Sequence, residues 1–426
     1  MAQKFGILSL GCARNLVDSE VIAGRLKQKG CEIIDLDSAG NSFFEGKAKA
    51  DVALVNTCAF IKEAKEESVR AILDLIELKK RGKVKKIIVA GCLSQRYKQE
   101  LFRQLPEVDA FLGTISLNHA QRRFRLVPSH YAYVKICEGC VDNCSFCVIP
   151  RIKPKFTSRS PESIISEVRA LDSRGLSEIN LIGQDISAYG WDLYREFRLT
   201  GLIERILKNT HRISWVRLLY LSPRRLSDGL IDLIADSARI VKYVDLPLQH
   251  INDRILKLMG RDVGSSGIRR LIDKIRKKIP DAAIRTSLIV GFPTETEKEF
   301  KQLLAFVKEA RFERLGLFMY SREESTKAYG FKGQVSRRVK EERYNTIMSC
   351  QREIAGRLNR RWQGKTLKVL IEKKEEERLY IGRSQHDAPE VDGLVYVKSE
   401  KELPAGSFED VKIVDTWEYD LVGEAQ

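Results

Sequence analysis

The stretch Cys137-Glu-Gly-Cys-Val-Asp-Asn-Cys-Ser-Phe-Cys-Val-Ile-Pro150 carries the most specific signal in this sequence. It sets Cys140, Cys144 and Cys147 in the spacing Cys-x3-Cys-x2-Cys, which lets one loop wrap three thiolates round an iron–sulfur cube. Three ligands leave one iron of a 4Fe-4S cluster open to a small molecule, whereas a four-cysteine cluster has no open iron. The alternative is a structural zinc site with Cys137 as fourth ligand, although zinc knuckles more often pair two Cys-x2-Cys units.

This loop follows the first of six predicted strands that alternate with helical segments. The strands are Tyr133–Ile136, Glu178–Ile182, Trp215–Leu221, Tyr243–Pro247, Ile284–Val290 and Arg314–Tyr320. The first helix is marked by Ser160 as N-cap, Pro161 at its first position and Gly175 after its end. Six such units predict an incomplete relative of the eight-fold barrel, with its chemistry at the C-terminal ends of the strands.

A second cysteine group precedes this barrel. The short apolar runs Phe5–Leu10, Val52–Val55 and Ile87–Ala90 alternate with amphipathic segments at Ser19–Lys29 and Lys62–Lys79, which predicts a doubly wound α/β domain. Cys12, Cys58 and Cys92 each lie just past one of these strands, and the C-terminal ends of parallel strands meet at one crevice. The sequence therefore predicts a second three-cysteine cluster. The alternative is three unrelated buried thiols, the interpretation we also give to Cys31 and Cys350.

The C-terminal region has a different pattern. After a polar helix at Ser336–Asn359, short strands separated by Pro and Gly turns predict a small all-β barrel; they are Leu367–Glu372, Leu379–Arg383, Leu394–Val397 and Phe408–Asp415. The expected fold is thus α/β with three domains. These are an N-terminal doubly wound domain at 1–126, a central partial (β/α)6 barrel at 127–360 and a C-terminal β-barrel at 361–426.

Two glycine-containing loops are candidates for holding a nucleoside-like ligand. Gly183-Gln184-Asp185 follows the second barrel strand, and Gly291-Phe-Pro-Thr-Glu295 follows the fifth. Either loop alone is weak evidence, because glycine is common in the turns after strands. His250 ends the fourth strand, where it is either a polar residue of the site or a structural histidine.

Composition limits the class of protein. The 426 residues carry a net charge of +16, which favours nucleic acid or a ribonucleoprotein as partner. The last 65 residues nevertheless hold nine basic and fifteen acidic side chains. No apolar run is long enough to span a bilayer and no signal peptide is evident, so we expect a cytoplasmic protein without a membrane partner.

These residues resemble the methylthiotransferases of the radical S-adenosylmethionine superfamily, in the branch with RimO-type and MiaB-type members. The resemblance covers essentially the whole chain. It is carried by the Cys140–Cys147 loop and by Ser9-Leu-Gly-Cys-Ala-Arg-Asn-Leu-Val-Asp-Ser-Glu20, Val55-Asn-Thr-Cys-Ala-Phe60, Ala90-Gly-Cys92, Asp245-Leu-Pro-Leu-Gln-His250 and Gly291-Phe-Pro-Thr-Glu295. Departures are Lys153-Pro154, where an Arg-Gly pair is expected, Tyr220-Leu-Ser-Pro223 in place of Tyr-x-His-Pro, and Cys137 at a position expected to be small and apolar.

The resemblance implies two 4Fe-4S clusters and a C-terminal TRAM barrel. The cluster on Cys140, Cys144 and Cys147 would bind S-adenosylmethionine and cleave it to a 5′-deoxyadenosyl radical, and Phe146 would lie against the adenine. The cluster on Cys12, Cys58 and Cys92 would carry the sulfur that is methylated and transferred. No catalytic residue beyond these ligands is identified, and the reductant protein is unknown.

Two substrates are known for this branch, a tRNA adenosine and an aspartate β-carbon of a small-subunit ribosomal protein. The segment Ser9–Glu20 and the run Gly382-Arg-Ser-Gln-His-Asp-Ala-Pro-Glu-Val-Asp-Gly393 resemble the RimO type, which modifies the protein. The acidic C-terminal region agrees, because it would repel a phosphate backbone and attract a basic protein, with Glu390 and Asp392 as candidate contacts. A ribosome or rRNA contact through the basic body is also expected. The alternatives are the MiaB-type tRNA enzyme and an iron–sulfur or zinc protein that binds RNA without catalysis.

Overall fold

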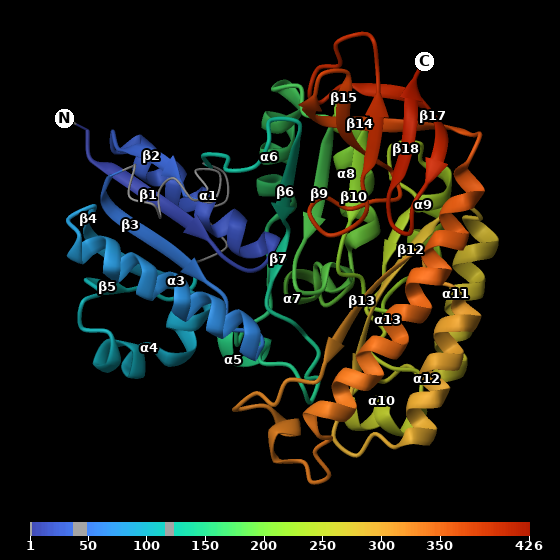
Figure 1. Ribbon diagram of the computed structural model, residues 1–426, viewed down its shortest axis with the longest axis horizontal. Helices are drawn as coiled ribbons and strands as arrows, with labels where there is room; N and C mark the ends of the chain where they lie inside the picture. The colour runs from blue at the N-terminus through green and yellow to red at the C-terminus, as the bar shows by residue number, and fades with distance from the viewer. Residues whose placement is uncertain (1, 37–48, 116–122) are drawn as a thin grey trace.

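The computed structural model describes residues 2–36, 49–115 and 123–426 and contains three folded parts (Figure 1). An N-terminal α/β domain lies beside a central barrel of strands and helices, and a small β-barrel covers one end of the central one. The three-domain α/β fold expected from the sequence is therefore confirmed. Among the described residues, none of the helices has the length and apolar character needed to cross a membrane.

The N-terminal domain is a five-stranded parallel sheet in the order β2-β1-β3-β4-β5, with Phe5 opposite Val52 in the central pair. Side chains alternate between its faces: Ile7 and Leu54 pack against α1, while Val55 and Val89 pack against α3 and α4. This two-sided burial makes the sheet doubly wound, as predicted. The elements are β1 (Lys4–Ser9), α1 (Ala13–Gln28), β2 (Glu32–Asp35), β3 (Ala50–Thr57), α3 (Lys62–Lys80), β4 (Val84–Gly91), α4 (Cys92–Gln104) and β5 (Ala110–Phe111).

The central domain has the six predicted parallel strands in two three-stranded sheets, β10-β9-β6 and β11-β12-β13. A single bridge between Val216 and Ile240 joins the two sheets, so the barrel is partial. Its strands are β6 (Tyr131–Lys135), β9 (Glu178–Ile182), β10 (Trp215–Leu218), β11 (Tyr243–Asp245), β12 (Ala283–Val290) and β13 (Arg314–Met319). A short hairpin of β7 (Cys137–Glu138) and β8 (Thr157–Ser158) flanks the cysteine loop.

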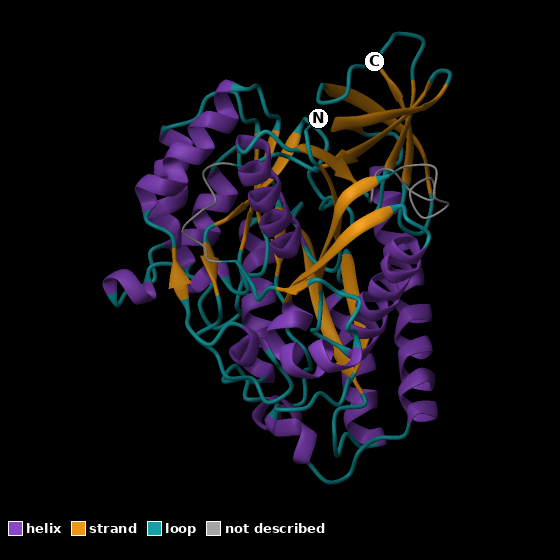
Figure 2. Ribbon diagram, turned by 90° about the vertical axis from the view of Figure 1, so that its left-hand side faces the viewer, coloured by secondary structure: helices purple, strands orange, loops and turns teal. Residues whose placement is uncertain are grey.

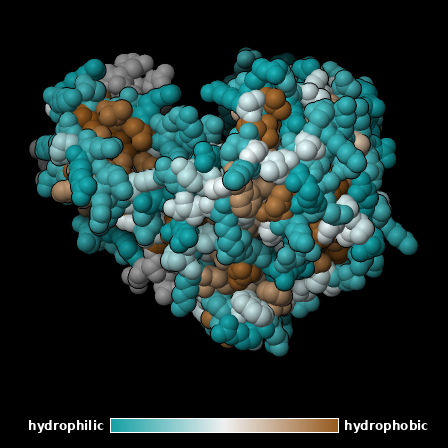
Figure 3. All heavy atoms as spheres, turned by 90° about the horizontal axis from the view of Figure 1, so that it is seen from below, coloured by the Kyte–Doolittle hydropathy of each residue, from teal (hydrophilic) through white to brown (hydrophobic). Residues whose placement is uncertain are grey.

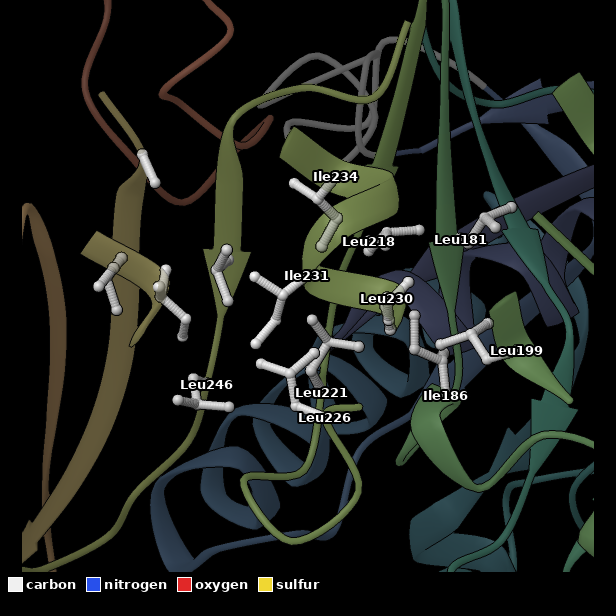
Figure 4. Close-up of a cluster of buried hydrophobic side chains, with 14 of the residues drawn as sticks. Leu181, Ile186, Leu199, Leu218, Leu221, Leu226, Leu230, Ile231, Ile234 and Leu246 are labelled. Atoms are coloured by element: carbon white, nitrogen blue, oxygen red, sulfur yellow. The ribbon is translucent and has the colours of Figure 1, made fainter. Parts of the chain in front are cut away.

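Helices cover the outside of this barrel. As predicted, Ser160 caps the first long helix through a hydrogen bond from Ser163 N, and Pro161 is its first residue. Leu230, Ile231 and Ile234 of one such helix pack toward the strand residues Leu181 and Leu218 (Figure 4). The helices are α5 (Ile149–Ile152), α6 (Pro161–Ser173), α7 (Trp191–Tyr194), α8 (Leu199–Lys208), α9 (Asp228–Asp236), α10 (Asp253–Met259), α11 (Ser265–Lys278), α12 (Glu297–Ala310) and α13 (Arg337–Asn359), with 3-10 turns at Ile186–Ala188, Lys327–Gly330 and Arg360–Trp362.

The C-terminal domain is a closed barrel in the order β14-β15-β16-β18-β17. Four of its strands were predicted, and the fifth was not. The strands are β14 (Thr366–Glu376), β15 (Leu379–Ser384), β16 (Val395–Lys398), β17 (Phe408–Thr416) and β18 (Leu421–Ala425). It sits over the N-terminal ends of the central strands, while β7, α5 and α10 lie at the opposite end (Figure 1), and Figure 2 shows its strands set apart from the helix-covered remainder.

The run between β15 and β16 closes the central barrel at the N-terminal ends of its strands. Asp387 binds Arg314 at the start of β13, Asp392 accepts a hydrogen bond from Tyr243 at the start of β11, and Ala388 joins a hydrophobic cluster built from all three domains. The side chains of Asp387 and Asp392 are almost fully buried. The expectation that Asp392 contacts substrate is therefore wrong, because its charge is used inside the protein; Glu390, which accepts a hydrogen bond from Tyr131, remains exposed.

The remaining surface is predominantly hydrophilic. Seen from the end that carries the cysteine loop, it shows separate hydrophobic patches among polar side chains (Figure 3). Among the exposed apolar residues, Phe60 and Phe318 line the cavity described below.

Candidate functional site

The cysteine loop opens into a cavity of about 390 Å³ at the C-terminal ends of the barrel strands. This is the end at which barrels of this kind place their chemistry. Five central strands contribute to the wall through the loops that follow them, and the N-terminal domain closes one side through Arg14, Phe60 and Ile61. Predicted site residues in the wall are Cys140, Cys144, Phe146, Cys147, Gln184 and Asp185.

Local hydrogen bonds shape the cysteine loop. Cys147 N donates to Cys144 O over 3.2 Å, and Asp142 N points at Cys140 Sγ over 3.4 Å. The loop is fixed to the end of α10, because Ser145 N donates to Met259 O over 2.9 Å. Thus Cys140, Cys144 and Cys147 converge from a single turn.

Burial governs the protonation of these thiols. It raises the pKa of Cys140 and of Cys147 to about 12, and each nearby thiol adds to the rise. Arg261 opposes this at Cys144, where its guanidinium lies 3.8 Å from Sγ, but burial still raises the pKa. Three crowded thiols that resist ionisation become thiolates when a metal centre supplies positive charge. The donor set therefore fits an iron–sulfur cluster.

Two carboxylates lie near Cys140 and could form a mixed thiol and carboxylate metal site with it. Ligand atoms of Cys140, Asp142 and Asp185 lie within 4.8 Å of one another. Both carboxylates, however, bind the guanidinium of Arg225, with 2.6 Å between Arg225 Nη2 and Asp142 Oδ2. Arg225 offsets one of the two negative charges, and all four carboxylate oxygens accept hydrogen bonds from Arg225 or Ser187. The three thiols therefore fit a metal centre better than these carboxylates do.

Cys137 points away from this triad. Its side chain is fully buried, and Sγ donates toward Asp185 O over 3.5 Å beneath the loop that follows β9. A Cβ atom added to Gly183 would lie 2.5 Å from the same sulfur. Cys137 is thus used in packing under residues 183–185, which argues against a zinc site with Cys137 as fourth ligand.

The N-terminal domain brings together the second group of cysteines. Cys12 is the N-cap of α1, Cys92 is the first residue of α4, and Cys58 follows β3. Burial raises the pKa of Cys92 to about 12, with further contributions from Cys58 and Cys12, so the three thiols interact directly. Partial positive charge at the two helix N-termini favours thiolates there.

Asn15 and two glycines hold this second group in place. Asn15 Nδ2 donates to Leu10 O and Thr57 O over 2.9 and 3.0 Å, and Asn15 Oδ1 lies 3.7 Å from Cys92 Sγ. Gly11 has φ +88°, and a Cβ there would lie 2.9 Å from Cys58 Sγ. Gly91 is equally constrained, with φ +96° and a Cβ position 2.6 Å from Thr57 O. Three thiols in such a cradle also fit an iron–sulfur cluster.

The two loops predicted to hold a nucleoside-like ligand contribute unequally to the cavity wall. Gln184 and Asp185 line the cavity, and Gln184 Oε1 accepts a hydrogen bond of 2.9 Å from Gly139 N. Gly183 and Gly291 are not among the lining residues. Gly291 has φ +71°, and its N–H donates to Glu295 Oε2 over 2.8 Å, so it shapes the turn before α12.

His250 is a structural residue, the second of the two interpretations of its position. It is fully buried, its Nδ1 accepts a hydrogen bond of 2.9 Å from Asn252 N, and it does not line the cavity. Burial lowers its pKa to about 3, so the imidazole is neutral.

Four cationic residues of the site were not singled out from the sequence: Arg14, Arg225, Arg261 and Arg285. Arg14 reaches the cavity from the N-terminal domain, and Arg225 holds the two aspartates beside the cysteine loop. Only the three-dimensional arrangement distinguishes them from the many other arginines of this basic chain.

Comparison with protein families agrees with this three-part construction. Residues 134–307 match the Radical SAM superfamily, residues 4–113 match the uncharacterized protein family UPF0004, and residues 364–425 match the TRAM domain.

Curated relatives match the chain over nearly its full length. A ribosomal protein uS12 methylthiotransferase RimO from Thermoanaerobacter sp. (strain X514) is 43% identical over 445 residues, which cover 98% of this chain and 99% of the relative. The protein of the same name from Aquifex aeolicus (strain VF5) is 44% identical, with 99% and 96% covered.

Solved structures resemble the chain in fold alone. The radical S-adenosylmethionine methyltransferase TsrM from Kitasatospora setae matches with a TM-score of 0.55 at 14% identity, covering 77% of each chain. The cobalamin-dependent S-adenosylmethionine radical enzyme OxsB matches with a TM-score of 0.51 at 12% identity, covering 83% of this chain and 56% of the other.

Proposed function

This chain belongs to the radical S-adenosylmethionine methylthiotransferases of the RimO type, and we propose that it methylthiolates the β-carbon of an aspartate in ribosomal protein uS12. The observation that carries the proposal is the arrangement of six cysteines as two separate groups of three, one on the cavity wall and one in the domain that closes it. A methylthiotransferase needs both a radical source and a sulfur donor, and each group of three leaves an open iron for one of them.

The first group is proposed to hold the cluster that binds S-adenosylmethionine. Cys140, Cys144 and Cys147 supply the thiolates, and Arg261 beside Cys144 offsets part of their negative charge. Gln184, Asp185 and Phe146 line the same cavity, so we assign them to the cofactor, with Phe146 against the adenine. Gly183 and Gly291 are assigned an indirect part, through the loops they shape. When bound, the cluster supplies the electron that cleaves S-adenosylmethionine to a 5′-deoxyadenosyl radical.

The second group, Cys12, Cys58 and Cys92, is proposed to hold a second 4Fe-4S cluster that carries the transferred sulfur. Asn15 fixes the backbone next to two of these cysteines and lies beside the third thiol. Burial raises the pKa of Cys12, but the positive charge of Arg14 together with the backbone N–H groups of Asn15 and Arg14 brings the pKa below its ordinary value. Cys12 is therefore the most readily ionised thiol of the three.

Each of the three domains has a separate task, and the protein has partners besides its substrate. We propose that residues 1–126 carry the sulfur-donating cluster, 127–360 the radical chemistry and 361–426 contacts with substrate. A separate protein supplies electrons, and the basic body contacts the ribosome or rRNA. Because ribosomes assemble in the cytoplasm, the proposal includes a cytoplasmic location.

The competing function is methylthiolation of a tRNA adenosine. Mass spectrometry of ribosomal proteins and tRNA from cells that lack this protein distinguishes the two. We expect uS12 to lose its methylthio group while tRNA keeps its modified adenosine, and restoring the gene should restore uS12. Loss of methylthioadenosine with unchanged uS12 would instead identify the tRNA enzyme.

A further inference from the structure

Arg14 lies between the two cysteine groups. It is the second residue of α1, and its side chain enters the cavity that Cys140, Cys144 and Cys147 line. Its positive charge acts on Cys12 and Cys92 on one side and on Cys147 on the other. A cation in this position faces the space where sulfur and radical must meet on the substrate.

Two contacts fix the orientation of the guanidinium. Nη1 donates to Gly183 O over 2.9 Å, and the Cζ atom lies 4.5 Å from the ring centre of Tyr220. A guanidinium has five N–H donors in a rigid plane. These contacts therefore leave donors for a ligand that enters the cavity, in an orientation set beforehand by the stacked ring.

Tyr220 is held in an unusual backbone conformation to make this stacking. Its φ is +66°, in the left-handed region that is strained for a residue with a side chain, and its N–H donates to Asp245 Oδ2 over 2.8 Å. Such strain is concentrated at functional sites, where surrounding structure maintains it.

The other cations of the cavity are already engaged. Arg261 donates to Pro247 O over 2.7 Å and faces the Cys144 thiol. Arg285 pairs with Asp245 at 3.2 Å and with Asp392 at 3.6 Å. Within residues 2–36, 49–115 and 123–426, Arg14 has no carboxylate at ion-pair distance, so it is the cavity arginine of this part of the chain best placed to receive one from a substrate.

We propose that Arg14 binds the side-chain carboxylate of the target aspartate and so positions its β-carbon between the two cysteine groups. The β-carbon is bonded directly to the carboxyl carbon, so a charge-assisted hydrogen bond from the guanidinium restricts it to the region around Arg14. This inference rests on the proposed function and identifies the residue that would select aspartate over a neutral side chain.

The test compares binding of uS12 with binding of a uS12 variant that has asparagine at the target position. Reconstituted holoenzyme is titrated with each protein in the presence of S-adenosylmethionine and without reductant, so that no turnover occurs. Wild type should bind the aspartate form roughly 10- to 100-fold more tightly, the range expected for one hydrogen bond to a charged group. Arg14→Gln should lose this preference, and Arg14→Lys should keep part of it.

Matched controls separate a binding role from a structural one. Arg25→Gln removes an exposed arginine from the same helix and should bind like wild type. Iron content and 5′-deoxyadenosine formation are measured for every variant, and Arg14→Lys, which keeps the positive charge beside Cys12, should keep its iron. An unchanged aspartate preference in Arg14→Gln, or equal weakening of both uS12 forms, would overturn the inference. Failure of wild type to modify uS12 at all would instead contradict the proposed function.

Discussion

The phenol hydroxyl of Tyr243, at the start of β11, donates a hydrogen bond of 2.5 Å to Oδ2 of Asp392 in the C-terminal domain. The same carboxylate accepts a hydrogen bond of 2.9 Å from Ala388 N and lies 3.6 Å from Arg285. Arg285 in turn pairs with Asp245, whose other oxygen holds the backbone of Tyr220 in the cavity. The C-terminal domain is thus connected to the active cavity through the interior of the barrel.

Replacing Asp392 should destabilise the protein. Asp392→Ala leaves the Tyr243 hydroxyl and Ala388 N–H without their buried acceptor and removes one of the two carboxylates beside Arg285. This should cost about 1–3 kcal/mol and lower the melting temperature. Thermal unfolding of the purified protein measures this. Glu377→Ala changes an exposed acidic residue of the same domain and serves as the control. Equal melting temperatures for Asp392→Ala and wild type would refute the buried role.

The effects of substitutions at Gly183 and Cys137 on stability should be strongly coupled. In Gly183→Ala the new methyl group meets Cys137 Sγ at 2.5 Å, so we expect a loss of stability of about 1–3 kcal/mol. Cys137→Ala alone should keep its iron and activity, because Cys137 is not in either cysteine group. The double variant should recover much of the stability lost by Gly183→Ala. Additive losses in denaturant unfolding, or loss of iron from Cys137→Ala, would show that the packing is described wrongly.

Acid should destabilise the protein in part through His386. Burial lowers the pKa of His386 to about 4, against an ordinary value of 6.5, although Asp387 and Asp281 oppose the shift. The unfolded chain therefore binds a proton that the folded protein does not, and stability falls as pH drops from 6.5 toward 4. The loss from this group is on the order of 3 kcal/mol. Between pH 6.5 and pH 4, the melting temperature should fall less for His386→Gln than for wild type. The exposed control His211→Gln should show the same pH dependence as wild type.

Exposed acidic residues on the C-terminal barrel should favour a basic protein over RNA. Glu376 and Glu377 lie at the exposed hairpin between β14 and β15, unlike the buried Asp392. Glu376→Lys with Glu377→Lys should weaken uS12 binding, and added salt should weaken the wild-type interaction. Binding assays with uS12 and with tRNA measure whether each affinity rises or falls. Tighter binding of tRNA as a functional substrate, with uS12 unaffected, would support the tRNA enzyme.

The sequence predicted the strands that build the site better than the strands at the edges. All three cysteine-bearing strands and all six barrel strands were found, because buried parallel strands form short continuous apolar runs. The edge strands β2 and β5, the two-residue strands β7 and β8 beside the cysteine loop and the last strand β18 were missed. β2 and β5 have four and two residues, and β18 contains Gly423 and Glu424, so neither hydrophobic run nor alternation marks them.

Contacts between domains were beyond prediction from the sequence. Asp387 and Asp392 stand in a polar run that has the composition of an exposed loop, yet both are buried by partners about 70 to 150 positions away. Arg14 likewise follows Cys12 by two positions without any pattern of its own. In both cases the deciding fact is which residues of another domain lie opposite the side chain.

The central claim, a radical source and a sulfur donor on separate cysteine groups, is tested most directly by one assay on two triple variants. Holoenzyme, uS12, S-adenosylmethionine, sulfide and reductant are incubated, and iron, 5′-deoxyadenosine and methylthiolated uS12 are measured. Replacing Cys12, Cys58 and Cys92 with Ala should remove about half the iron and leave some 5′-deoxyadenosine without methylthio product. Replacing Cys140, Cys144 and Cys147 should also halve the iron but abolish 5′-deoxyadenosine. Full iron in either variant, or methylthiolated uS12 from the first, would contradict this account.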